Sequence, residues 1–441
     1  MEISFVHVLL CLSAGIAAII LLTTFLRVHA FFALLIASFV VGLGVMLPAE
    51  TVMNAVKDGF GNIMRSLGLI IVLGTTLGVM LEHSGATTVM ANFILRKTGE
   101  RRAPLAMSIT GFVVGLPIFC DSGYIVLSGV NNSIARRTSI PMAVMAGSLA
   151  TGLYAVHCLL PPHPGAAAAA GIIGADLGKL IMFGIIIAIP AMFTGYLWVR
   201  FAGRNLPVQK FKPAEENAIP ENYPSVLQAF LPVFVPILLI ATRAILMNFT
   251  EPGSALSRLL FIGDPAVALA VGILLAFTGK RNRRTTAVAP LLQEAAEKAG
   301  GILVIIGAGG AFGAVLAITE IGKHFSESMP LGTMGIFFPF LLTAILKTAQ
   351  GSSTVAIITS ASIILPLLPA LGLQSEHDKI ITVLSMGAGS MMVAHANDAY
   401  FWVIAKFSGL DMRSMLKTYT VSSVLMALCS LVMVYILKFF T

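Results

Sequence analysis

Long apolar runs alternate with short polar clusters along the whole chain. Clear apolar runs occupy positions 31–47, 181–199, 226–240 and 302–318. A helix of about 20 such residues crosses the hydrocarbon core of a bilayer, which is about 30 Å thick. The pattern therefore predicts an all-α polytopic membrane protein.

Composition agrees with this prediction. Of the 441 residues, 57% are hydrophobic and 11% are charged, whereas a soluble domain carries about 25% charged residues. The net charge of +8 does not indicate a nucleic-acid partner. The basic residues form short clusters between apolar segments, where they act as topology signals.

No cofactor and no metal site are expected. The chain has no P-loop, no dinucleotide-binding glycine pattern and no zinc motif. The N-terminus lacks a basic stretch and a cleavage site, so we expect it to form a first membrane span. The four cysteines lie in apolar context without metal-ligand spacing: Cys11, Cys120, Cys158 and Cys429.

Lys and Arg mark the cytoplasmic side of a membrane protein. Placing every basic cluster inside predicts a multi-pass protein of a bacterial inner membrane with a periplasmic N-terminus. The clusters lie at 27, 96–102, 136–137, 200–212, 280–284 and 406–417. The expected ordinary spans lie near 4–24, 30–48, 60–82, 140–160, 179–200, 225–247, 259–279, 301–319, 380–395 and 418–439.

The apolar segment 104–135 has basic residues on both flanks. It is too short for two full spans of about 20 residues each and a turn. We therefore expect a re-entrant hairpin, whose tip lies at 115–123, where Pro117 and two glycines disfavour helix. The alternative is one ordinary span with Arg136 and Arg137 outside, which would invert every later cluster.

The second half repeats this organisation. We expect two inverted repeats, each with about five transmembrane helices, one re-entrant hairpin and an interrupted helix, as in many secondary transporters. Ala146-Gly147-Ser148 precedes His157, and Ala388-Gly389-Ser390 precedes His395. The predicted units are the first repeat 1–200 with hairpin 104–135 and interrupted helix 140–178, the cytoplasmic linker 201–224, and the second repeat 225–441 with hairpin 331–370 and interrupted helix 380–410.

Unpaired backbone at membrane depth is tolerated only where protein or a water-filled cavity surrounds it. The hairpin tips and helix breaks therefore predict one enclosed polar site near the midplane. Half-helix N-termini, hydroxyls and amides suit an anionic ligand. The candidate substrate-binding residues are Cys120, Ser122, Gly123, His163, Gln350, Gly351, Ser352, Ser353, Thr354 and Asn397.

Titratable groups at these breaks are candidates for proton coupling. Asp121 and Asp398 are carboxyl groups in apolar surroundings, where an ionisable group is costly. His157 and His395 occupy matching places in the two halves and titrate near neutral pH. Helix capping for the aspartates and ordinary core packing for the histidines remain the alternatives. Lys347 either pairs with a substrate carboxylate or extends to an interface.

Four stretches resemble signatures of the gluconate permease family, which comprises bacterial gluconate:proton symporters. They are GLPIFCDSGYIVLSG (115–129), ATGLYAVHCLLPPHPG (150–165), LKTAQGSSTVAIITSAS (346–362) and AHANDAYFWV (394–403). The resemblance covers essentially the whole chain and implies import of D-gluconate or a related sugar acid with a proton. The family is similar to the ion-transporter superfamily, which implies an elevator mechanism and a homodimer.

Other functions remain open at this point. Family members also carry idonate, fructuronate or D-serine, so the resemblance does not fix the substrate. A sodium-coupled carrier would use the same broken helices, because these expose carbonyl and hydroxyl oxygens. A channel is a further alternative, although two occluding hairpins favour alternating access. An intramembrane enzyme would need a paired nucleophile and base, and no serine and histidine stand at a recognisable spacing.

Overall fold

The computed structural model describes residues 5–206, 223–247, 250, 254–278, 288–319 and 331–439. Within these ranges every regular element is a helix, which confirms the all-α prediction. In the part of the chain that the structure describes, eight helical segments are long and apolar enough to cross a membrane. A further pair, Ala255–Gly263 and Pro265–Ala276, passes the same test together but bends by 60°.

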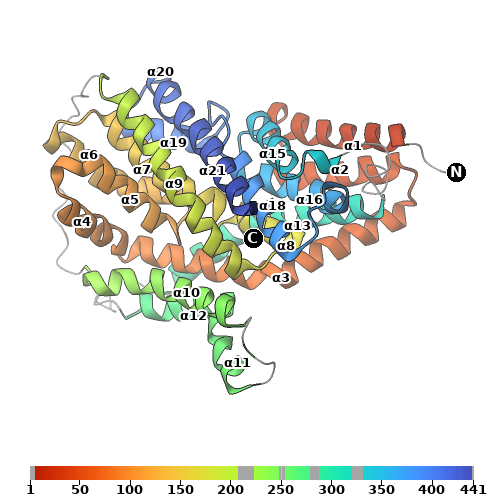
Figure 1. Ribbon diagram of the computed structural model, residues 1–441, viewed down its shortest axis with the longest axis horizontal. Coiled ribbons are helices and arrows are strands. Elements are labelled where there is room, and N and C mark those ends of the chain that lie inside the picture. Colours follow the sequence, from red (N-terminus) through yellow and green to blue (C-terminus); the bar gives the residue numbers. More distant parts are fainter. Residues whose placement is uncertain are drawn as a thin grey trace.

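Figure 1 shows the arrangement of the helices of the two halves. The first half holds α1 (Phe5–Ile20), α2 (Ala30–Gly44), α3 (Ala49–His83), α4 (Ala86–Thr98), α5 (Ala103–Gly115), α6 (Cys120–Thr138), α7 (Met142–Leu159), α8 (Pro164–Ile173) and α9 (Leu177–Gly203). The second half holds α10 (Val226–Leu246), α11 (Ala255–Leu259), α12 (Pro265–Ala276), α13 (Val288–Ile318), α15 (Phe337–Gln350), α16 (Ser353–Ile364), α17 (Leu368–Leu371), α18 (Glu376–Gly389), α19 (Ala399–Ser408), α20 (Met412–Met415) and α21 (Val421–Phe439).

Three details differ from the expected spans. The sequence analysis missed α4, a helix of 13 residues that is too short to cross a bilayer and buries one face of small and apolar side chains. Helix α13 begins at Val288, well before the expected 301. At the second hairpin the polar stretch from Lys347 to Gln350 remains helical, and only Gly351 and Ser352 separate α15 from α16.

Some predicted features lie outside the described residues. They are most of the linker (207–222), the basic cluster at 280–284 and the loop 320–330.

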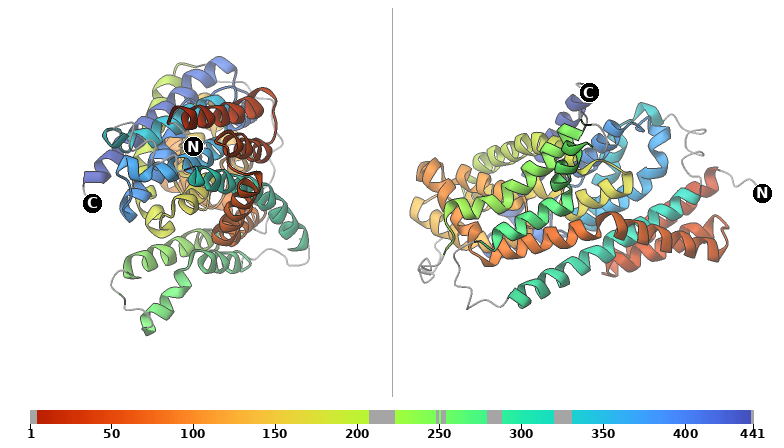
Figure 2. Two further views of the ribbon diagram at one scale, coloured as in Figure 1. Left: turned by 90° about the vertical axis from the view of Figure 1, so that its right-hand side faces the viewer. Right: turned by 90° about the horizontal axis from the view of Figure 1, so that it is seen from below.

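The long helices α3 and α13 pack against each other through glycines. A Cβ on Gly59 would lie 2.4 Å from the Gly310 carbonyl oxygen, and one on Gly307 would lie 2.4 Å from the Phe60 ring. Because any side chain would collide there, these glycines allow close helix contact. Helices α10, α11 and α12 project from one side of the bundle (Figure 2).

The two hairpin segments exchange partners between the halves. Helix α5 packs on α7, and α15 packs on α18 in the same way. The inner arm α16, however, packs on α8 of the first half, and α6 packs on α19 of the second half. Figure 1 shows α8 among the helices of the second half. This exchange brings the helix breaks at 116–119, 160–163, 351–352 and 390–398 toward one region.

An ion pair joins the residues just before and just after the first hairpin segment, 104–135. Arg137 Nη2, at the end of α6, lies 2.9 Å from Glu100 Oε1, just before α5. The two ends of segment 104–135 therefore lie side by side, as a hairpin requires.

Candidate functional site

Four helices begin at the interruptions, and their first turns lie close together. A Cβ on Gly165, in the first turn of α8, would lie 3.3 Å from the Thr354 Cα in the first turn of α16. The rings of Tyr124 in α6 and Tyr400 in α19 meet edge to face at 6.0 Å. Since a helix N-terminus carries partial positive charge and free N–H groups, this region suits an anion.

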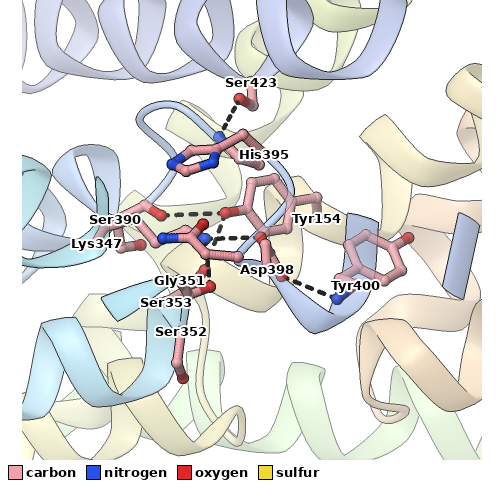
Figure 3. A network of polar contacts seen from close by, with 12 residues as sticks. Tyr154, Lys347, Gly351, Ser352, Ser353, Ser390, His395, Asp398, Tyr400 and Ser423 are labelled. Carbon is pink, nitrogen blue, oxygen red and sulfur yellow. Dashed lines mark hydrogen bonds and ion pairs between the residues drawn. The ribbon is translucent and has the colours of Figure 1, made fainter. Parts of the chain in front are cut away.

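A buried ion pair occupies the second hairpin tip (Figure 3). Lys347 Nζ lies 2.6 Å from Asp398 Oδ2 and donates a second hydrogen bond of 2.6 Å to the Gly351 carbonyl oxygen. The Lys347 side chain is 0% exposed and that of Asp398 is 7% exposed. Lys347 therefore does not extend to an interface, and its pairing with a substrate carboxylate stays a prediction.

Asp398 also begins α19. Its Oδ1 accepts a hydrogen bond of 2.9 Å from the Tyr400 backbone N–H, which caps the helix. The capping alternative for Asp398 is thus present in the structure, together with the ion pair. One carboxylate links the start of α19 to the tip between α15 and α16.

Buried tyrosines surround the Lys347–Asp398 pair, and none of them was among the candidate residues predicted from the sequence. The Tyr154 hydroxyl lies 2.9 Å from Ser353 Oγ and donates to the Ser390 carbonyl oxygen at 3.1 Å. It thereby connects α7, α16 and α18 (Figure 3). Tyr154 and Tyr400 lie within two of the family-like stretches, so their position in those stretches was the signal that could have identified them. The tyrosines at most 3% exposed are Tyr124, Tyr154, Tyr400 and Tyr419.

The first hairpin tip contacts the break between α7 and α8. His163 is 1% exposed and donates from Nε2 to the Gly115 carbonyl oxygen at 2.7 Å. Its ring meets the His157 ring edge to face at 5.1 Å. The Nδ1 atoms of both histidines are buried without a hydrogen-bond partner in the described part of the chain. His163 is therefore buried where the first hairpin tip meets the α7–α8 break.

The second tip is held against the α18–α19 break by further contacts. Asn397 donates from Nδ2 to the Thr348 carbonyl oxygen at 2.8 Å, and His395 Nε2 lies 3.3 Å from the same oxygen. Gly351 has φ +81°, and a Cβ there would lie 2.1 Å from the Asn397 carbonyl oxygen. Only glycine fits this position.

Neighbouring polar residues of the second tip have different surroundings. Ser352 Oγ accepts a hydrogen bond of 3.3 Å from the Val355 N–H, so it caps α16. Both amide atoms of Gln350 are buried and have no hydrogen-bond partner among the described residues. An unpaired buried amide is costly and is able to bind a ligand.

The other candidates lie at the start of α6. Cys120 is 3% exposed, and its Sγ lies 3.9 Å from Asp121 Oδ1. The Asp121 side chain is exposed, and that of Ser122 is half-buried. A Cβ on Gly123 would lie 2.8 Å from Leu153 Cδ2, so Gly123 allows α6 to pack closely on α7.

Comparison with known proteins identifies the family. The sequence profile described as "GntP family permease" matches residues 7–440. This chain belongs to the GntP permease family. A gluconate permease of Pseudomonas aeruginosa is 32% identical over 98% of each chain. The Gnt-II system L-idonate transporter of Escherichia coli is 32% identical over 96% of this chain and 97% of its own length.

Solved structures agree with this GntP assignment at the level of the fold. The Alcanivorax borkumensis YdaH transporter superposes with a TM-score of 0.65 at 18% identity, covering 90% of each chain. Neisseria gonorrhoeae MtrF superposes with a TM-score of 0.61 at 15% identity, covering 88% of this chain and 84% of its own. The GntP relatives are named permeases or transporters, so this multi-pass membrane protein is a transport protein for a small molecule and not an enzyme.

Proposed function

We propose that this GntP permease imports D-gluconate or a related sugar acid together with a proton across a bacterial inner membrane. Sugar acids stand in the names of the relatives: two are a gluconate permease and an L-idonate transporter, and a third, from Escherichia coli, is a high-affinity gluconate transporter. Each of these substrates carries one carboxylate and several hydroxyl groups.

The observation that carries the proposal is the buried pair of Lys347 and Asp398. Among the lysines and arginines that the structure describes, Lys347 alone is buried. A cation stabilises a substrate carboxylate, and among the described residues the Lys347 ammonium is the buried cation at the helix breaks. Its present partner is a carboxylate, which has the same chemistry as the carboxylate of the substrate.

This pair suggests how proton and anion are coupled. A proton that binds Asp398 Oδ2 neutralises the partner of Lys347, and the ammonium then pairs with the substrate carboxylate. An unpaired buried charge costs several kcal/mol. The carrier therefore changes orientation either empty, with Lys347 paired to Asp398, or with one proton and one monoanion bound. The loaded and empty sites carry equal charge, so transport is electroneutral.

The same geometry favours a proton over a sodium ion. Sodium sites in such transporters use backbone carbonyl oxygens at broken helices. Here the Lys347 ammonium already binds the Gly351 carbonyl oxygen, together with the Asp398 carboxylate. We therefore prefer proton coupling to the sodium-coupled alternative.

The surrounding neutral side chains bind the hydroxyl groups of the substrate in this proposal. They are Gln350, Ser353 and Thr354 at the second hairpin tip and His163 at the first. The remaining proposed substrate contacts are Cys120, Ser122, Gly123, Gly351, Ser352 and Asn397. Asp121, His157 and His395 complete the proposed proton-coupling set; the His157 ring stacks on Tyr154 at 6.5 Å.

The proposed mechanism is elevator-type alternating access. The matching contacts of α5 with α7 and of α15 with α18 support two inverted repeats, for which we propose 1–200 and 225–441, joined by the linker 201–224. The Glu100–Arg137 ion pair supports a re-entrant hairpin at 104–135, and α15 with α16 forms the matching hairpin at 331–370. A homodimeric scaffold and a periplasmic N-terminus belong to the same proposal.

Uptake into proteoliposomes tests this function. Labelled gluconate should accumulate when the outside is acidic, in sodium-free buffer, and a proton ionophore should abolish accumulation. Unlabelled idonate should compete, and D-serine should not. Accumulation that requires sodium at constant pH would contradict proton coupling, and accumulation of D-serine in place of gluconate would contradict the substrate class.

A further inference from the structure

A basic cavity lies away from the helix breaks. It is formed by the N-terminal ends of α5 and α7 and the C-terminal end of α9. Its volume is about 430 Å³, and its lining includes four arginines, Tyr196 and Pro141. The arginines are Arg101, Arg102, Arg200 and Arg204. They come from two basic clusters that are far apart in the sequence, and the fold brings them to one opening.

The arginines have no acidic partners in the ranges that the structure describes. Among the described residues, no carboxylate oxygen forms an ion pair with any of the four guanidinium groups. Nearby Arg137 is paired with Glu100 instead. Arg200 Nη1 donates to the Tyr196 hydroxyl at 3.3 Å. Clustered guanidinium groups favour phosphate, which they bind through two parallel hydrogen bonds.

An apolar stripe on α9 leads to the cavity. Its side chains are 39–59% exposed and recur every three or four residues, so they form one face of the helix: Ile186, Ile189, Phe193, Leu197 and Phe201. The stripe ends beside Arg200 and Arg204. Trp198, an aromatic residue typical of the membrane interface, lies in the same turn.

We infer that this cavity binds the phosphate headgroup of an anionic phospholipid, whose acyl chains lie along the α9 stripe. Basic pockets between transmembrane helices on the cytoplasmic side bind such headgroups. The stripe argues for a lipid, because a soluble phosphate or nucleotide has no apolar part to cover it. The inference requires these basic clusters to be cytoplasmic, but it is independent of the transported substrate.

The experiment measures binding of a fluorescent phosphatidylglycerol to the full-length protein in neutral detergent. The test variant combines Arg200→Gln with Arg204→Gln. Its matched control combines Lys406→Gln with Arg413→Gln, which removes two exposed cations outside the cavity. We expect the test variant to bind about 30-fold more weakly and the control to bind as the unmodified protein does. Phosphatidylethanolamine and inorganic phosphate should not compete.

Each other outcome overturns the inference. Equal loss in test and control would show non-specific attraction to positive charge, and unchanged binding in both would exclude the cavity. Competition by inorganic phosphate at similar concentration would show a site for free anions. If the test variant fails to fold, Arg101→Gln with Arg102→Gln probes the opposite wall of the cavity, and the same result is expected.

Discussion

The Lys347 ammonium and the Asp398 carboxylate lie 2.6 Å apart, although the two residues are 51 positions apart in the sequence. Lys347 lies in the last turn of α15, and Asp398 caps the N-terminus of α19, which follows the α18–α19 break. Both are almost inaccessible to water. The contact joins two of the four helix breaks through charge, and the proposed mechanism has a proton and an anion exchange places there.

Removing both charges separates the stabilising role of this pair from its transport role. Lys347→Gln alone should destabilise the protein by about 3–5 kcal/mol, because it leaves a buried carboxylate unpaired. Lys347→Gln with Asp398→Asn should recover most of that loss. Neither variant should bind gluconate, since both lack the cation. Thermal unfolding and gluconate affinity in detergent are the two measurements.

The matched control for these variants is Lys379→Gln. Lys379 forms an exposed ion pair with Glu376 and lies outside the site. It should change stability by less than about 1 kcal/mol and leave gluconate affinity unaltered. Gluconate binding by the double variant would show that Lys347 does not hold the substrate.

Asp398→Asn should uncouple transport from the proton. The asparagine cannot bind a proton but keeps an oxygen for the Tyr400 N–H, so α19 remains capped. Lys347 is then free at every pH. We expect exchange of internal for external gluconate to continue, while accumulation driven by a pH gradient is lost. Accumulation equal to that of the unmodified protein would remove Asp398 from the coupling mechanism.

Gln350→Met should weaken gluconate binding by about tenfold, or about 1.4 kcal/mol. The amide has no hydrogen-bond partner in the described part of the chain, so a substrate hydroxyl is its expected ligand. Stability should not fall, because methionine has a similar size and leaves no unpaired polar atom. Gln293→Met, at an exposed position of α13, is the control. A stability change without an affinity change would make Gln350 a structural residue only.

Cysteine labelling tests the first hairpin. In a background without native cysteines, Arg102→Cys and Arg137→Cys should both react with an impermeant reagent from the cytoplasmic face only. The Glu100–Arg137 ion pair places these two ends side by side. Labelling from opposite faces would exclude a re-entrant hairpin at 104–135.

Much of the fold followed from apolar periodicity and helix-breaking residues. Pro117 and the glycines around it predicted the break that the structure has at 116–119. Helix α4 was not predicted, because a short helix that packs on other helices lacks the long apolar run of a membrane span. The polar residues from Lys347 to Gln350 belong to helix α15, and the Lys347 charge is paired with Asp398 and not with water.

The sequence indicated residues of the candidate site, but not which of them contact one another. Breaks in matching places indicated His163, Gln350 and Asp398 as neighbours of a single site. The partner of Lys347 did not follow, because the contact of the second hairpin tip with the α18–α19 break is a tertiary property within the second half. The contacts of Tyr154 did not follow because its hydroxyl bonds to Ser353 and Ser390, which lie in the other half of the chain.

The most direct test of the central claim measures protons and charge together during gluconate transport. Proteoliposomes that contain the unmodified protein and an internal pH dye receive gluconate in sodium-free buffer, with the membrane potential clamped at several values by potassium and valinomycin. In the proposed mechanism the substrate carboxylate replaces Asp398 as the partner of Lys347. This predicts that one proton is taken up per gluconate and that the rate of gluconate uptake does not depend on the membrane potential. Gluconate entry without protons, or at a rate that rises steeply with potential, would contradict it.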